Sequence, residues 1–311
     1  MIVLRKMIRY IRNPIRLLYR FVVCLDNTIY IRKLPDVLCI KSLYYLALGK
    51  KLDLLNPLTF SQKLQWLKIY YRNPLYTMIA DKYRLREYVK SKGLEKHLVP
   101  FIGTWDNFDD IDFDKLPSKF VLKCNHDCGS TIICKEKESF DIDYARAKLM
   151  KCMNTNYYFS SPYREWQYRD IIPKILGEHF IAGSDGNAPA DYKVHCFNSV
   201  PKYIQLISGR FTRNISESWY DENWNYQDLT YAFPCSSQGV DRPKELEELL
   251  SLSSKLSQGI PYVRVDFYIA KGNVYLGELT FTPWAGFIPF KPQEWDKRLG
   301  DLIELPKKYT V

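Results

Sequence analysis

The segment Val263-Arg-Val-Asp-Phe-Tyr-Ile-Ala-Lys-Gly-Asn-Val-Tyr-Leu-Gly-Glu-Leu-Thr280 predicts two antiparallel β-strands joined by a tight turn. Its first half alternates apolar and polar residues, and side chains two apart in a strand share a face. One face is therefore apolar, and the other carries Arg264, Asp266 and Tyr268. We place the turn at Lys271-Gly-Asn273, because Gly and Asn tolerate positive φ.

Glu278 and Thr280 share a face of the second strand by the same alternation. A hairpin brings this glutamate beside Asp266, and two neighbouring carboxylates repel each other unless a positive charge lies between them. Hard divalent cations such as Mg²⁺ bind such oxygen ligands, usually together with nucleotide phosphates. The alternative is a hairpin whose polar face meets solvent, as in many antiparallel sheets.

The bulk composition is that of a globular protein with a basic N-terminal arm. Of 311 residues, 46% are hydrophobic and 26% charged, which argues against disorder. Ten lysines and arginines against two aspartates in residues 1–50 account for +8 of the net charge of +10. Eight scattered cysteines without paired CxxC spacing favour a reducing, cytoplasmic compartment. No uncharged apolar run is long enough for a transmembrane helix.

Residues 1–25 predict a basic amphipathic helix, restarted at Asn13-Pro14. Such a helix can lie on an anionic membrane surface, here the inner face. Alternatively, it packs its apolar stripe on the body of the protein. Because the charge is confined to this arm, without stacking aromatic residues across a sheet, we expect no nucleic-acid partner.

The rest of the chain predicts an α+β organisation whose strands are mostly antiparallel. We divide it into an arm (1–55) and a main region (56–311), the latter comprising a helical lead-in (56–100) and two lobes (101–180 and 181–311). Expected helices cover residues 59–72, 76–89, 144–154 and 243–256. Expected strands cover residues 120–125, 132–135, 171–181, 192–197 and 202–208, besides the opening hairpin.

Lys123 lies in the apolar strand 120–124, directly before the loop Asn125-His-Asp-Cys-Gly-Ser-Thr131. A lysine on a buried strand is costly unless it faces an anion, although a sheet edge also accommodates one. A loop of small polar residues can offer backbone N–H groups to phosphate. Farther along, Glu178, Asp191 and Lys193 interrupt apolar strands, and Arg210 follows in a polar stretch.

The order of these segments resembles the ATP-grasp superfamily, and most closely its TupA-like branch, which is associated with teichuronopeptide and surface-polysaccharide biosynthesis. The resemblance runs from about residue 56 to 295. The segments that carry it are Phe60-Ser-Gln-Lys-Leu-Gln-Trp-Leu-Lys68, Arg72-Asn-Pro-Leu-Tyr76, Asp81-Lys-Tyr83, Lys119-Phe-Val-Leu-Lys-Cys-Asn-His126, Asp191-Tyr-Lys193 and Gly277-Glu-Leu-Thr280.

The resemblance implies an ATP-grasp fold, in which two α+β lobes hold ATP between antiparallel sheets. It implies three groups of site residues. Those that bind the nucleotide are Lys123, His126, Gly129, Ser130, Thr131, Glu178, Ile181 and Asp191, with the segment 178–181 as the adenine hinge. Those near the reacting groups are Lys193, Arg210 and Arg264, and those on magnesium are Asp266, Glu278 and Thr280.

The chain departs from the pattern of the family at the third metal ligand and in the phosphate loop. Thr280 stands where many relatives carry an asparagine metal ligand, and the loop 126–131 holds a single glycine, with Asp127 and Cys128 where relatives often have Gly and Ser. An aspartate there would repel phosphate unless it turned away.

The function that we expect is an ATP-dependent carboxylate–amine ligase acting through an acyl phosphate. Its partners would be ATP, Mg²⁺, a glycan or lipid-linked glycan precursor, and an amino-acid or amine co-substrate. The sequence leaves open a kinase of a sugar hydroxyl, because both reactions need the same groups. It also leaves open a glycosyltransferase, because three Asp-x-Asp pairs occur at residues 110–112, 112–114 and 141–143.

Overall fold

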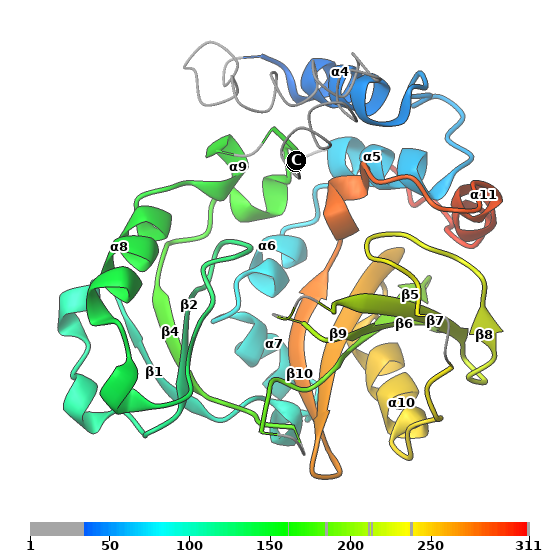
Figure 1. Ribbon diagram of the computed structural model, residues 1–311. Coiled ribbons are helices and arrows are strands. Elements are labelled where there is room, and N and C mark those ends of the chain that lie inside the picture. Colours follow the sequence, from blue (N-terminus) through cyan, green and yellow to red (C-terminus); the bar gives the residue numbers. More distant parts are fainter. Residues whose placement is uncertain are drawn as a thin grey trace, which may run out of the picture.

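A computed structural model describes residues 34–160, 162–183, 186–210, 212, 214–236 and 239–309. Figure 1 shows two lobes, each built on a sheet, with α6 and α7 between them and α4, α5, α9 and α11 along one end. The amphipathic helix expected at residues 1–25 lies outside the described residues. None of the described helices has the length and apolar content needed to cross a bilayer.

The helices are short and are joined by several 3₁₀ turns. Their bounds are α4 Asp36–Leu48, α5 Phe60–Tyr70, α6 Leu75–Ala80, α7 Leu85–Ser91, α8 Ile142–Met153, α9 Tyr157–Ser160, α10 Leu246–Leu256 and α11 Glu294–Asp301.

Two sheets carry the lobes, and every strand pairing within them is antiparallel, as the sequence predicted. The four-stranded sheet has the order β1-β4-β2-β3, and the six-stranded sheet has the order β10-β9-β5-β6-β7-β8. The first contains β1 Phe101–Trp105, β2 Phe120–Cys124, β3 Ile132–Cys134 and β4 Ile175–His179. The second contains β5 Asp191–Phe197, β6 Val200–Ser208, β7 Ser216–Asp221, β8 Tyr226–Gln227, β9 Tyr262–Ala270 and β10 Asn273–Thr280.

The hairpin predicted from residues 263–280 forms as β9 and β10, and a β-bulge between Leu276 and Glu278 shifts the register so that Asp266 lies opposite Glu278. The turn differs in one detail, because positive φ falls on Lys271 and Gly272 (51° and 74°) while Asn273 already belongs to β10. Two successive residues with positive φ make the turn that suits the right-handed twist of a hairpin.

The helical lead-in also forms, but its second part is divided. The helix predicted for residues 76–89 is interrupted after α6, because Asp81 is extended and its carboxylate accepts hydrogen bonds from the backbone N–H groups of Tyr83 and Arg84. A side chain that bonds nearby backbone in this way competes with the helix.

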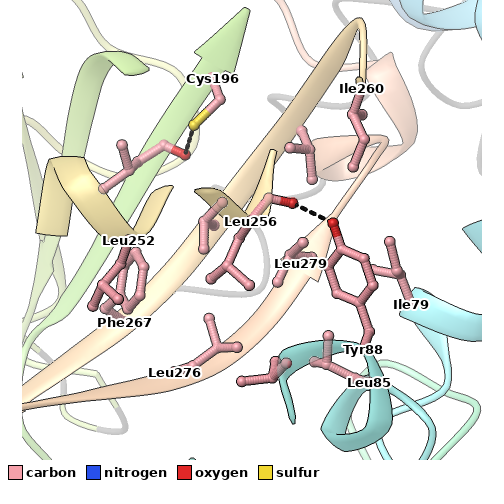
Figure 2. Packing of buried hydrophobic residues seen from close by; sticks show 14 of the residues in the cluster. Ile79, Leu85, Tyr88, Cys196, Leu252, Leu256, Ile260, Phe267, Leu276 and Leu279 are labelled. Carbon is pink, nitrogen blue, oxygen red and sulfur yellow. Dashed lines mark hydrogen bonds between the residues drawn. The ribbon is translucent and has the colours of Figure 1, made fainter. Parts of the chain in front are cut away.

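The largest core lies between the six-stranded sheet and the helices α6, α7 and α10 (Figure 2). Val263, Val265 and Phe267 of β9 are fully buried in it, so the apolar face of the hairpin points into this core. Tyr88 of α7 donates a hydrogen bond of 2.9 Å to the carbonyl of Leu256 at the end of α10. The opposite, polar face of the hairpin is thereby left to build the site.

Candidate functional site

A small cavity of about 120 Å³ lies between the two sheets. Lys123 lines it from β2, and its Nζ lies 2.5 Å from Glu178 Oε2 on the neighbouring strand β4. Arg86 of α7 approaches the other carboxylate oxygen at 3.5 Å. Ile181 and Thr131 also line this cavity. The partly buried strand lysine therefore faces an anion, but in this structure the anion is the carboxylate of Glu178.

A larger cavity of about 720 Å³ adjoins the polar face of the six-stranded sheet. Asp191 and Lys193 of β5 line it beside Arg264 of β9 and Glu278 of β10. Pairing of β5 with β9 places Asp191 opposite Tyr268 and Lys193 opposite Asp266. The hairpin and β5 therefore present one continuous polar surface, which faces this cavity instead of the bulk solvent considered from sequence.

Asp266 is the centre of an ion-pair network on that surface. Arg264 Nε and Nη2 donate to its two carboxylate oxygens at 2.7 and 2.8 Å, and Lys193 Nζ donates to one of them. Burial alone would raise the pKa of Asp266, but the adjacent Arg264 and Lys193 outweigh burial and lower it to about 2. The carboxylate is therefore ionised at neutral pH although its residue is only 2% exposed.

Arg264 also joins the two carboxylates of the hairpin. Its Nη2 lies 3.7 Å from Glu278 Oε1 and donates to the Thr280 hydroxyl at 3.1 Å. The Thr280 hydroxyl in turn donates to Glu278 at 3.3 Å. The positive charge that two adjacent carboxylates require is thus supplied by a residue of the hairpin itself.

The two cavities share Asp191 and Arg210, which line both. Arg210 Nη1 donates to Asp191 Oδ2 at 2.7 Å, so this ion pair stands where one cavity meets the other. Two residues along a strand span roughly 6.6 Å, which is the step from Asp191 to Lys193 on β5. The small cavity beside Lys123 and the larger cavity beside Glu278 are therefore adjacent, with Asp191 and Arg210 lining both.

The donors on the hairpin suit Mg²⁺, which prefers carboxylate and hydroxyl oxygens. Glu278 and Thr280 line the larger cavity, and the Glu278 side chain is 37% exposed. Asp266 does not line the cavity, but it accepts three hydrogen bonds, and a carboxylate has about four lone-pair positions. One acceptor position of Asp266 therefore remains for a cation.

The loop 126–131 is held more firmly than its sequence suggested. His126 is 1% exposed, and its Nε2 lies 3.2 and 3.1 Å from the carbonyls of Cys152 and Thr155, so it lines neither cavity. The buried Ser130 hydroxyl donates to Asp127 and accepts from the Cys124 backbone N–H.

Asp127 is thus turned inward, which removes the conflict with phosphate expected from the sequence. Cys128 reaches the larger cavity and Thr131 the small one, whereas Gly129 has a φ of 116° and lines neither. The loop can therefore offer its backbone and Thr131, but not His126 or Ser130, to a ligand in this arrangement.

Several residues of the larger cavity were not predicted from the sequence. Glu165 lines it, as do the aromatic residues Tyr157, Tyr163, Tyr168, Phe233, Trp284 and Phe287. Lys68 and Gln65 of α5 donate hydrogen bonds of 2.9 Å to the Ala285 carbonyl in the cavity wall. The available signal was a glutamine and a lysine three residues apart on one face of the helix, in a segment that the resemblance had already singled out.

The Asp-x-Asp pairs lie elsewhere. Asp112 forms an exposed ion pair with Lys115 at 2.8 Å, and Asp141 accepts a hydrogen bond from the backbone N–H of Tyr144 at the start of α8. None of the aspartates at residues 110–114 and 141–143 lines either cavity. These acids have local structural partners, and the geometry gives no support to a glycosyltransferase site.

Comparison with protein families matches residues 62–304 to the family described as TupA-like ATPgrasp. None of the curated proteins compared with the chain matches it.

Solved structures with a similar fold include D-alanine–D-alanine ligases from two bacteria. The Bacillus anthracis enzyme complexed with ATP has 17% identity and a TM-score of 0.40, with 66% of this chain and 55% of that chain covered. The Helicobacter pylori enzyme has 15% identity and a TM-score of 0.41, with 79% and 69% covered. A third structure is the ATP-grasp ligase PsnB complexed with minimal precursor, Mg and ADP, at 11% identity and a TM-score of 0.36, with 71% and 57% covered. The chain thus spans between half and two thirds of the length of some of these ligases.

Proposed function

Because the chain belongs to the TupA-like ATP-grasp family, we propose that it is an ATP-dependent carboxylate–amine ligase acting through an acyl phosphate. The observation that supports this most is the junction of the two cavities at Asp191 and Arg210. One cavity carries the lysine expected to bind phosphates, and the other carries the hairpin acids. ATP placed across the junction would direct its γ-phosphate toward Lys193 and Arg264.

In the proposed reaction, an oxygen of the acceptor carboxylate bonds to the γ-phosphorus while the bond to the departing ADP breaks. The amine, which is an ammonium ion in solution, first gives up one proton; its nitrogen then bonds to the activated carbonyl carbon, the bond to phosphate breaks, and the nitrogen gives up a second proton. Lys123, Lys193, Arg210 and Arg264 would offset the charge of the phosphates, and no side-chain nucleophile is needed. Magnesium held by Asp266 and Glu278, with Thr280, would neutralise charge on the phosphate oxygens.

For the acceptor, we propose a uronic acid or another carboxylated sugar of a surface-polysaccharide precursor, joined to an amino acid or amino sugar. The resemblance to the TupA-like branch motivates this assignment. The volume of about 720 Å³ and the aromatic walls of the larger cavity are compatible with a sugar ring packed against them.

The test is calorimetric titration of the full chain with ATP analogue and Mg²⁺, followed by ADP release against a panel of uronates and amines. We expect Mg²⁺-dependent nucleotide binding, and ADP release only when a carboxylate and an amine are both present. ADP release without an amine, together with a phosphorylated sugar, would assign the chain to the kinases instead. Absence of nucleotide binding would refute both assignments.

We further propose that the protein works as a peripheral protein at the cytoplasmic face of the membrane, with residues 1–25 as the main contact. Residues of α4, together with Leu34 two residues before it, support this idea. Leu34, Leu38, Lys41 and Tyr45 recur at spacings of three and four, and all four are exposed. Leu46 and Ala47 of the same helix line the larger cavity. A membrane that contacts α4 would therefore lie beside the acceptor site, as a lipid-linked precursor requires.

Sedimentation with vesicles tests this placement. The full chain is expected to sediment with vesicles that contain phosphatidylglycerol and much less with pure phosphatidylcholine. Leu38→Glu combined with Tyr45→Glu should weaken sedimentation, whereas Ile172→Glu, which changes an exposed apolar residue outside α4, should not. Equal sedimentation of all variants, or none by the parent chain, contradicts the proposed contact.

A further inference from the structure

A buried carboxylate in the wall of the larger cavity has no role in the proposed chemistry so far. Glu165 is 6% exposed and lines the cavity together with Arg264 and Glu278. Its Oε1 accepts a hydrogen bond from the Thr282 hydroxyl, and that hydroxyl accepts one of 3.3 Å from the Gln167 side-chain amide. The amide holds the threonine as a donor, so this chain of contacts fixes the orientation of the Glu165 carboxylate.

The charge of Glu165 has no direct counter-ion. Glu165 forms no ion pair with a lysine, arginine or histidine of the described residues. Lys68 is close enough for its charge to act on Glu165, but its ammonium donates hydrogen bonds of 2.9 Å to the carbonyls of Tyr163 and Ala285 instead. Burial raises the pKa of Glu165, and Lys68 and Thr282 oppose that effect. A buried carboxylate without a salt-bridge partner is costly, and a cationic ligand in the cavity would relieve that cost.

The surroundings of Glu165 suit an organic cation. Tyr157 and Tyr168 line the cavity with their ring centroids 5.0 Å apart in an edge-to-face arrangement. Burial, and after it the neighbouring Cys128 and Glu165, raise the pKa of both tyrosines, so they stay neutral beside the carboxylate. Aromatic faces next to a carboxylate are a common means of binding an ammonium group.

The two walls of the cavity differ in their charged groups. Lys193, Arg210 and Arg264 line the sheet side together with Asp191 and Glu278, so that side suits a phosphate with its metal ion, whereas Glu165 and the two tyrosines suit an organic cation. A ligase needs both kinds of group within one space, because its two substrates have opposite charges before they react.

We propose that Glu165 binds the ammonium group of the amine co-substrate, with Tyr157 and Tyr168 as the aromatic part of this subsite. The inference rests on the proposed ligase function and adds the class of ligand taken at this wall, a primary amine carried by an amino acid or amino sugar. Thr282 is a positioning residue, because it acts through Glu165.

The experiment uses the full chain loaded with Mg²⁺ and the ATP analogue AMPPNP. D-glucosamine, D-alanine and L-lysine are titrated as cationic probes, and N-acetyl-D-glucosamine serves as the neutral match for glucosamine. The variants are Glu165→Gln, Thr282→Val, and the control Glu294→Gln, which changes an exposed glutamate at the start of α11.

We expect at least one cationic probe to bind and its neutral match to bind more weakly. Glu165→Gln should weaken that binding by about tenfold or more, Thr282→Val by about threefold, and Glu294→Gln by less than about twofold. The affinity for AMPPNP should stay within about twofold in every variant, which also shows that the variants fold.

The subsite is overturned by equal amine binding of Glu165→Gln and the parent chain, by equal binding of the neutral analogue, or by no amine binding to a chain that binds the nucleotide. Weakened Mg²⁺ binding with unchanged amine binding would make Glu165 a metal ligand and overturn it as well. The amine titration is also repeated without nucleotide. If the parent chain does not bind the nucleotide, the ligase proposal is refuted, and the titration without nucleotide still tests the amine subsite.

Discussion

Replacement of Asp266 by asparagine removes the one charge that Arg264 and Lys193 both contact. The side chain keeps its shape but loses its negative charge, and two buried cations lose their shared partner. We therefore expect Asp266→Asn to lower the free energy of unfolding substantially, in the absence of any ligand or metal.

Two routes give the size of this effect. Asp266 titrates near pH 2 in the fold against 3.8 as its ordinary value, and this difference corresponds to about 2.5 kcal/mol. Removal of one partner from a buried ion pair costs about 3–5 kcal/mol in other proteins. The expected loss is therefore roughly 2–5 kcal/mol.

Urea unfolding followed by tryptophan fluorescence at pH 7, with EDTA present, measures this loss. The matched control is Asp301→Asn, because Asp301 and Lys297 form an exposed pair at 2.7 Å on one turn of helix. Such a pair contributes only about 0.3–0.5 kcal/mol. The Arg264–Asp266 and Lys297–Asp301 distances are both 2.7 Å. We therefore expect Asp266→Asn to lower the free energy of unfolding more than Asp301→Asn because its ion pairs are buried.

The pH dependence has a definite sign. Because the folded state lowers the pKa of Asp266, its contribution is complete above about pH 4 and is lost as the pH falls toward 2. The difference in free energy of unfolding between the parent chain and Asp266→Asn should therefore become smaller as the pH falls from about 4 to about 2. The ion-pair network around Asp266 is refuted if Asp266→Asn lowers the free energy of unfolding at pH 7 no more than Asp301→Asn does. It is also refuted if the difference from the parent chain stays constant down to pH 2.

Two further changes test other parts of the site. Lys123→Met removes the ammonium that lines the small cavity, and we expect calorimetry to show MgATP binding weakened by at least about tenfold, with unaltered affinity counting against a phosphate role. Gly286→Ala places a Cβ 2.5 Å from an amide nitrogen at a φ of 74°, so thermal unfolding should show a loss of more than about 1 kcal/mol, whereas Gly239→Ala, whose Cβ meets nothing within 4 Å, should be nearly neutral.

The sequence predicted the hairpin because its strands and turn are marked by local patterns. Alternation alone would have set Gly277 opposite Asp266, and a β-bulge between Leu276 and Glu278 shifts the register by one residue and brings Glu278 opposite Asp266. The helices at α5, α8 and α10 were likewise found from local patterns. Strands β7 and β8 were missed, because their sequences show neither clean alternation nor an apolar run.

Contacts between distant segments could not be read in this way. Lys193 bonds Asp266 because β5 pairs with β9, and the two residues are 73 positions apart. The surroundings of His126 could not be read locally either, because its place in a polar loop predicted phosphate binding, whereas in the fold its ring lies against the carbonyls of Cys152 and Thr155. Glu165 lies in irregular chain between α9 and β4, where no periodicity marks a functional residue.

The arrangement of the site follows from the geometry of one strand pair. Asp191 and Lys193 are two residues apart on β5, so they share a face, and antiparallel pairing sets Tyr268 and Asp266 opposite them in the same step. The Asp191–Tyr268 pair lies at the small cavity, which Tyr268 lines, and the Lys193–Asp266 pair lies at the large cavity, which Lys193 lines. A shift of β5 by one residue would turn both polar side chains into the apolar core and separate Lys193 from Asp266. The register between β5 and β9 thus determines whether the small cavity, proposed to bind the nucleotide, adjoins the large cavity, proposed to bind the acceptor.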